Sequence, residues 1–242
     1  MLSPLLEHAS TFLGNAVALF EVACSAGIPD LVLVHIDGDA MAERVGTAPL
    51  AESSDVLVML ALQGAVEGLT PTDLANACRV GRPHLQRRIL PRLIEHGHLE
   101  RAEGLYRSTY AFRSLARSVV TVEAKLRDWR TGLSQASRHA TVADAAWLVM
   151  DYRNTAAAAH AEWFKTFGVA LAFLSTDGGL LPVVAPGVNR SRQPGRELLV
   201  ERAVALHSSG AVSGPLPRVF GTVPVATASD PRVRGAAAHS RP

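Results

Sequence analysis

The sequence predicts an α/β protein whose core is interrupted by a mainly helical segment. Three observations support this fold class. Beyond residue 113, apolar runs of strand length alternate with helical periods, as they do when helices pack on a sheet. Residues 50–113 have a different hydrophobic pattern, because three helical periods follow one another closely. Hydrophobic residues make up 48% of the 242 positions, which is enough to bury a core.

The N-terminal part, residues 1–48, predicts one helix and a β-hairpin. In order, the pattern indicates a helix, a strand, a turn and a second strand at residues 3–15, 17–24, 25–29 and 30–35. The turn contains Gly27 and Pro29, which are typical turn residues. Asp37-Gly38-Asp39 is expected to end the second strand.

The segment 50–113 predicts three helices followed by a hairpin. The helices are expected at about 55–63, 71–78 and 83–96, and the hairpin at 99–107. Thr70 is an N-cap candidate with Pro71 at the first helical position. Pro91 removes one hydrogen bond from the third helix, so this helix is expected to bend or to be shorter. Gly104 marks the hairpin tip.

The remainder of the chain alternates strands and helices again. Strands are expected at 118–126, 145–150, 169–174 and 180–184, and helices at 128–140 and 153–167. From residue 187 the chain is rich in Arg, Ser, Pro and Gly, with one helical candidate at 196–207 and expected disorder in most of the rest. The predicted division is therefore a discontinuous core (1–48 and 114–186), an inserted module (50–113) and a C-terminal segment (187–242).

Composition excludes several classes of protein. The formal charge of +2 does not by itself indicate a nucleic-acid partner, although arginines cluster locally. Cys24 and Cys78 are too few and too far apart for a disulfide framework or a zinc site. The N-terminus has no basic leader, and no apolar stretch reaches about 18 residues. A cytoplasmic protein with no membrane partner is expected.

Glu123 and Lys125 are two positions apart in the apolar run 118–126. Side chains alternate along a strand, so both project to the same face. Lys125 is one of only two lysines among 24 basic residues, and lysine is a compact charge with a tunable pKa whereas arginine is a broad planar fork. Asp30, at the start of another apolar strand, can add a second carboxylate. This set predicts a site for a hard cation such as Mg²⁺.

The pair Pro29-Asp30 followed by Glu123-Ala124-Lys125 resembles the signature of the PD-(D/E)XK nuclease superfamily, the restriction-endonuclease-like fold. The order helix, strand, strand with Pro-Asp, strand with Glu-X-Lys, helix, strand matches that family's core over about residues 3–150. The resemblance implies a central mixed sheet flanked by helices. It also implies that Asp30, Glu123 and the backbone carbonyl of Ala124 bind Mg²⁺ (or Mn²⁺), and that Lys125 orients or activates the attacking water.

Three further residues are candidates for supporting this site. Glu21 is expected on the strand just before the turn, where many members of the family place another acidic residue. Gln135 and His139 are four positions apart on one face of the following helix. Some branches of the family have a glutamine there followed by a tyrosine, from which His139 departs. The alternative is that Glu21 is a solvated strand residue and that the helical pair faces water.

The order helix, helix, turn, helix, hairpin in residues 55–110 resembles a winged helix-turn-helix domain. The resemblance implies that its third helix and wing contact DNA, since the side-chain types there bind phosphates and base edges. The residues expected to contact DNA are Arg82, His84, Gln86, Arg87, Arg88, Arg92, Arg101 and Arg107. A winged helix used for protein contact or dimerisation is the alternative.

Together these features predict a Mg²⁺-dependent nuclease that hydrolyses phosphodiester bonds of DNA. The catalytic set would be Asp30, Glu123 and Lys125, supported by Glu21 and Gln135. DNA is the expected partner, and a homodimer is compatible with the sequence. Two alternatives stay open: a winged-helix transcriptional regulator with an inactive nuclease-like core, and an interaction protein that does not touch nucleic acid. In a purely structural interpretation, Glu123 and Lys125 form an edge-strand ion pair and Asp30 caps a turn.

Overall fold

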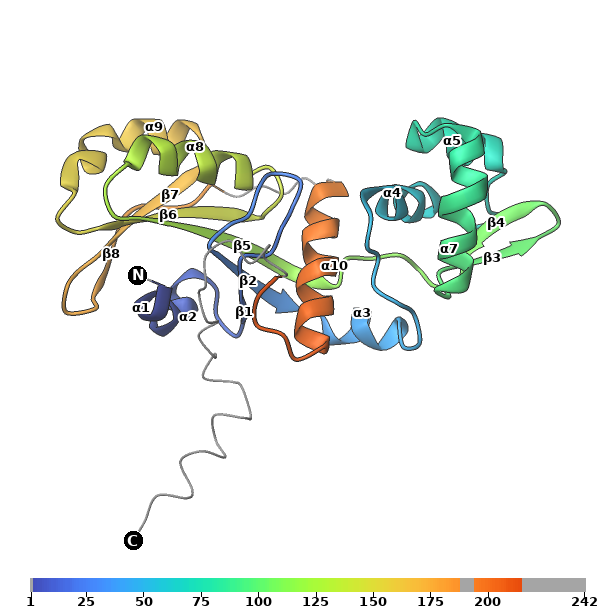
Figure 1. Ribbon diagram of the computed structural model, residues 1–242, viewed down its shortest axis with the longest axis horizontal. Coiled ribbons are helices and arrows are strands. Elements are labelled where there is room, and N and C mark those ends of the chain that lie inside the picture. The colour runs from blue at the N-terminus through green and yellow to red at the C-terminus, as the bar shows by residue number, and fades with distance from the viewer. Residues whose placement is uncertain (1, 188–193, 215–242) are drawn as a thin grey trace, which may run out of the picture.

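The computed structural model describes residues 2–187 and 194–214, which form a mixed α/β structure around a six-stranded mixed sheet flanked by helices (Figure 1). The strands are β1 (Val17–Phe20), β2 (Leu31–Ile36), β5 (Ala116–Lys125), β6 (Ala145–Asp151), β7 (Val169–Leu174) and β8 (Leu180–Val184). They lie in the order β1-β2-β5-β6-β7-β8. β1, β2 and β5 pair antiparallel, β5, β6 and β7 pair parallel, and β8 returns antiparallel. The α/β prediction with a central mixed sheet is thus confirmed.

Helices cover both faces of this sheet. Helices α1 (Leu2–Glu7) and α2 (Ala9–Phe12) cover one face, where Leu5 and Phe12 pack against β2, β5 and β6. On the other face, α8 (Trp129–His139) and α9 (Ala161–Thr166) pack on β6 and β7, and α10 (Pro194–Ser208) packs on β1 and β2. A strip of β5 therefore lies between two separate apolar clusters on this second face.

A second unit with its own buried cluster lies between β2 and β5 in the sequence, and beyond α10 in space (Figure 1). It comprises α4 (Ser53–Leu62), α5 (Pro71–Cys78), α6 (Arg82–His84), the π-turn η1 (Leu85–Ile89), α7 (Leu90–Glu95), β3 (Leu99–Ala102) and β4 (Leu105–Ser108). The Thr70 side chain caps α5 as expected, accepting from the Asp73 N–H at 3.2 Å. The β3–β4 hairpin turns at Gly104, whose φ of +82° only glycine adopts easily.

The third predicted helix, 83–96, is not a continuous α-helix. Its middle turn, η1, is wider, and the N–H of Leu90 donates to the carbonyl of Leu85. Pro91 follows directly, lacks an N–H and excludes a normal turn before it. A π-turn accommodates one extra residue per turn. The bend predicted from Pro91 is thus realised as a local change of helix type.

Three other element predictions were wrong in detail. Asp37 does not simply end a strand, because its side chain accepts from the N–H groups of Asp39 and Ala40 and caps an additional helix, α3 (Gly38–Glu43). The first strand ends at Phe20 rather than residue 24, since the next residue has a left-handed φ of +53°. The helix expected at 153–167 is divided into a 3₁₀ segment, η2 (Thr155–His160), and α9.

Helix α10 joins the sheet to the second unit. Leu199 and Val200 pack on the sheet, whereas Leu198 packs into the cluster of the second unit. The helical candidate at 196–207 is thus present and buried. Disorder was expected for residues 210–242, but residues 211–214 are ordered beside β1, where the N–H of Phe20 donates to the Val212 carbonyl at 2.9 Å. The expectation for residues 215–242 lies outside the described residues. In the part of the chain that is described, no helix is long and apolar enough to cross a membrane.

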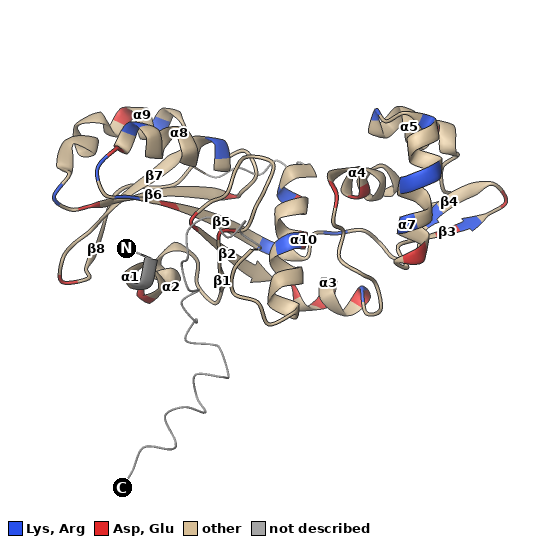
Figure 2. Cartoon of the chain, viewed as in Figure 1, with Lys and Arg blue, Asp and Glu red and all other residues tan. Residues whose placement is uncertain are grey.

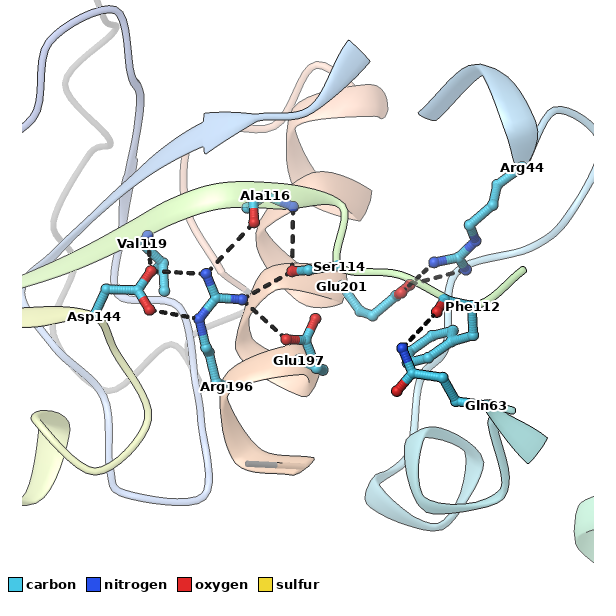
Figure 3. A network of polar contacts seen from close by, with 10 residues as sticks. All are labelled: Arg44, Gln63, Phe112, Ser114, Ala116, Val119, Asp144, Arg196, Glu197 and Glu201. Atoms are coloured by element: carbon cyan, nitrogen blue, oxygen red, sulfur yellow. Dashed lines mark hydrogen bonds and ion pairs between the residues drawn. The ribbon is translucent and has the colours of Figure 1, made fainter. Parts of the chain in front are cut away.

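Two ion pairs on α10 accompany this packing, one partly exposed at Asp144 and one buried between Arg44 and Glu201 (Figure 3). The Arg196 guanidinium donates to both oxygens of Asp144, at 2.8 and 2.7 Å. One turn along, both oxygens of Glu201 accept from Arg44, and one of them also accepts from the N–H of Leu50 at 3.1 Å. The first pair ties α10 to the segment before β6, and the second ties it to the chain that enters the second unit.

Replacing Glu201 by Ala should lower the free energy of unfolding by about 3–5 kcal/mol, because Arg44 would be left buried and unpaired. Chemical denaturation measures the change. Glu162→Ala is the matched control, since Glu162 pairs with Lys165 on the surface and should matter little. Equal effects of the two substitutions would contradict a stabilising role for the α10 network.

Candidate active site

Three carboxylates lie in a row across the ends of three neighbouring strands. The strand register pairs Phe20 with Leu31 and Leu31 with Val122. Glu21, Asp30 and Glu123 are the next residues along the chain beside these three, so they lie near one another. Phe20, Leu31 and Val122 all pack on the α1–α2 face. Strand alternation therefore directs Glu123, and Asp30 beside β2, toward the face that carries α8 and α10, whereas Glu21 lies beyond the end of β1 with a φ of +53°.

Asp30, Glu123 and Lys125 are brought together by direct contacts. The Asp30 Oδ2 accepts from the backbone N–H of Ala124 at 2.7 Å, which places this carboxylate beside the Glu-Ala-Lys segment. The Lys125 Nζ donates to the Glu123 Oε1 at 2.7 Å. The Glu123 side chain is only 2% exposed, whereas that of Lys125 is 26% exposed. Lys125 is thus partly exposed, while the carboxylate that it contacts is buried.

The charges in this row are not balanced. Burial raises the pKa of the Glu123 carboxyl, and the negative charge of Asp30 raises it further, while the Lys125 ammonium opposes both effects. Burial also raises the pKa of Asp30, against the Ala124 N–H and Lys125. Burial and then Asp30 raise the pKa of Glu21. The charge of Arg138 lowers the pKa of Glu123 as well, so burial and the neighbouring carboxylate are opposed by two positive charges.

Helix α8 packs closely against the Lys125 side chain. A Cβ built on Gly132 would lie 2.9 Å from the Cγ of Lys125 and 2.6 Å from the Cδ1 of Leu148. Only a glycine fits at this helix position without displacing its neighbours. His139 is at the end of the same helix, and its Nδ1 is 3.6 Å from the Glu123 Oε2. The helix after the Glu-Ala-Lys strand therefore forms one wall of the site.

Several buried polar atoms at this wall have no hydrogen-bond partner among the described residues. They are the Glu123 Oε2, the His139 Nδ1 and the Gln135 Oε1. Buried polar atoms without partners are uncommon in proteins, and a site that binds an ion or ordered water is one place where they occur. Carboxylate and carbonyl oxygens are the donors that Mg²⁺ prefers. Asp30 and Glu123 therefore fit a hard divalent cation, although within residues 2–187 and 194–214 no group of three or more His, Cys, Asp and Glu is arranged to hold a metal.

The supporting residues predicted from the sequence are placed differently. Glu21 is not on β1 but one residue beyond it, where its N–H donates to the Asp30 carbonyl at 3.4 Å. It therefore adjoins the site from a turn rather than from a strand. Gln135 lies on α8 one turn from Gly132, and its Oε1 is buried rather than facing water.

The residues of the second unit predicted to contact DNA divide into two groups. Arg82, His84, Gln86, Arg87, Arg88 and Arg101 are exposed. Arg92 differs from the expectation, because it donates to the buried Asp55 at 2.5 Å and joins α7 to α4. Arg107 donates to the Glu67 carbonyl at 3.0 Å. Figure 2 shows Lys and Arg positions recurring on the part that carries α5, α7 and the hairpin.

Two residues of the site wall are not among the site residues predicted from the sequence. Gly132 occupies a helix interior, where glycine is disfavoured, and that position was the available signal. The exposed Arg138 lowers the pKa of Glu123 through its charge. The sequence offers no signal for this interaction, which depends on how α8 lies across β5.

Comparisons of the chain with protein-family models, with curated proteins and with solved structures find no match in any of the three. What the site does is therefore argued from its own residues.

Gly132→Ala should lower the free energy of unfolding by about 1–3 kcal/mol, because the added methyl group overlaps Leu148 and Lys125. Chemical denaturation of the purified protein measures this change. Ser134→Ala, at an exposed position of the same helix, is the control and should be neutral or slightly stabilising. A stability gain in Gly132→Ala would show that α8 does not approach β5 this closely.

Proposed function

We propose that the protein is a Mg²⁺-dependent nuclease of the PD-(D/E)XK type that hydrolyses phosphodiester bonds of DNA. The observation that carries the proposal is the convergence of Asp30, Glu123 and Lys125, with the Asp30 carboxylate bonded to the N–H of Ala124. These residues are far apart in the sequence, and a turn-capping aspartate has no need to contact the Glu-Ala-Lys strand.

The strand order also supports the proposal. The Glu-Ala-Lys strand β5 lies between the strand that follows Asp30 and the parallel strand β6, and α8 connects β5 to β6. This is the arrangement that the resemblance implies for a restriction-endonuclease-like core. In that interpretation, the second unit is a winged helix-turn-helix domain inserted between β2 and β5.

In the proposed mechanism, Asp30, Glu123 and the Ala124 carbonyl would hold the cation. A bound Mg²⁺ would stabilise the negative charge that develops on the phosphate. Lys125 is held by Glu123 and is partly exposed, so its ammonium would be able to orient a water molecule for attack on phosphorus. Water adds to phosphorus, a bridging P–O bond breaks, and the departing oxygen takes up a proton. Lysine serves better than arginine here because its charge is compact.

Plasmid and linear DNA incubated with Mg²⁺ or Mn²⁺ should be cleaved by the wild-type protein and not in the presence of EDTA. Asp30→Asn, Glu123→Gln and Lys125→Ala should each lower the rate by about 100-fold or more. Lys165→Ala is the control, because Lys165 is the other lysine and pairs with Glu162 on the surface. Cleavage that survives all three site substitutions would overturn the proposal. Duplex binding without any cleavage would instead favour the transcriptional regulator.

The exposed arginines of the second unit should supply phosphate contacts. Substituting Arg87 and Arg88 together by Ala should weaken duplex binding and reduce the slope of log K against log salt by about 1 for each phosphate that the protein no longer binds. Fluorescence anisotropy at several salt concentrations measures the slope. Arg153→Ala is the control, because Arg153 is an exposed arginine of the core that pairs with Asp151. An unchanged slope in the double variant would assign the second unit to protein contacts.

A further inference from the structure

Glu123 and His139 form an unusual buried pair. Their side chains are 2% and 3% exposed, and the Glu123 Oε2 faces the His139 Nδ1 at 3.6 Å. Within the described part of the chain, neither atom has a hydrogen-bond partner. The other Glu123 oxygen, Oε1, is already occupied by Lys125. The unpaired oxygen and the unpaired nitrogen are thus neighbours, and a small movement of either side chain would bring them within hydrogen-bond distance.

His139 also contacts the segment that carries the other carboxylate. A Cβ built on Gly27 would lie 3.1 Å from the His139 Nε2. Gly27 has a φ of +128° and belongs to the turn that leads through Pro29 into Asp30. A larger residue at Gly27 would push the turn away from the imidazole. One ring therefore lies between the turn that carries Asp30 and the strand that carries Glu123.

We propose that His139 is a positioning residue of the cation site, whose Nδ1 orients the Glu123 carboxylate through Oε2 and whose opposite edge supports the turn that carries Asp30. The inference rests on the proposed function, because it assigns His139 to the same cation. It gives the site a residue that holds both carboxylates at a fixed separation. His139 is not itself a ligand in this arrangement.

The chemistry of an imidazole fits this role. A ring nitrogen that carries a proton donates to a carboxylate oxygen. Hydrogen bonds of this kind commonly fix the orientation of carboxylates that bind metals.

A simple packing role explains the position of His139 less well. Leu133 and Ala136, the neighbouring buried residues of α8, are apolar and fill the space against β6 and β7. A leucine would fill the space at 139 as well, without placing an unpaired nitrogen opposite an unpaired carboxylate oxygen. Replacing the imidazole by side chains of known shape separates packing from orientation.

The test measures Mn²⁺ binding to the full chain without DNA, by electron paramagnetic resonance, so that the readout does not depend on turnover. His139→Leu should weaken Mn²⁺ binding roughly 10–100-fold. His139→Asn, which places an amide nitrogen near the Nδ1 position, should retain most of the affinity. His139→Gln, whose amide instead reaches the Nε2 position, should lose it as Leu does. Thermal denaturation of each variant shows that the fold is intact.

Glu123→Gln distinguishes failure of this inference from failure of the proposed function. If Glu123→Gln abolishes Mn²⁺ binding and His139→Leu binds like the wild type, the inference is wrong and the nuclease proposal stands. If the wild type and Glu123→Gln bind Mn²⁺ equally, or neither binds it, the cation site itself is wrong. If His139→Leu does not fold, the comparison of Asn with Gln decides, and equal losses in these two variants overturn the role of Nδ1.

Discussion

The constraint on which the site depends is the crowding of carboxylates at one end of a sheet. Glu21, just beyond β1, and Asp30, just before β2, lie beside Glu123 on β5, since Asp30 contacts the N–H groups of both Glu21 and Ala124. Burial raises the pKa of all three carboxyl groups, and the charge of Asp30 raises those of Glu21 and Glu123 further, while Lys125 and Arg138 act in the opposite direction on Glu123. Apolar residues at these positions would avoid this cost. Under the proposed function, a bound cation would offset it.

Keeping this row in place requires rigid neighbours. The same face carries two apolar clusters, one beneath α10 and one beneath α8 and α9, and the strip of β5 with Glu123 lies between them. Helix α10 belongs to both units, since Leu198 packs into the second unit and Leu199 into the core. Its ion pairs with Asp144 and Arg44 fix the position of α10 along the sheet more specifically than apolar packing alone would. DNA bound by the second unit would thus be held at a fixed position relative to the core.

The strands and most helices could be predicted because their signals are local. Apolar runs gave the sheet strands to within two or three residues, apart from the early end of β1, and Thr70 with Pro71 marked the start of α5. The packing of α10 on the core could not be predicted from the sequence. Its apolar residues are interrupted by charged ones that resemble surface residues until their partners are known, namely Arg196, Glu197 and Glu201. Asp37 likewise looked like the end of a strand, since a cap and a turn use the same residue types.

For the site, the sequence could identify side-chain chemistry but not the approach of α8. Asp30, Glu123 and Lys125 were recognisable from their residue types and strand positions, and the distances between them follow from the register of β2 on β5. The choice of lysine becomes clearer in three dimensions. Gly132 of α8 lies close to the Lys125 Cγ, and the Lys125 Nζ donates to the buried Glu123 at 2.7 Å. Lysine carries a compact charge at the end of a flexible stem, whereas arginine spreads its charge over a broad planar fork. In a chain with 24 basic residues and two lysines, it is therefore a lysine that contacts this buried carboxylate.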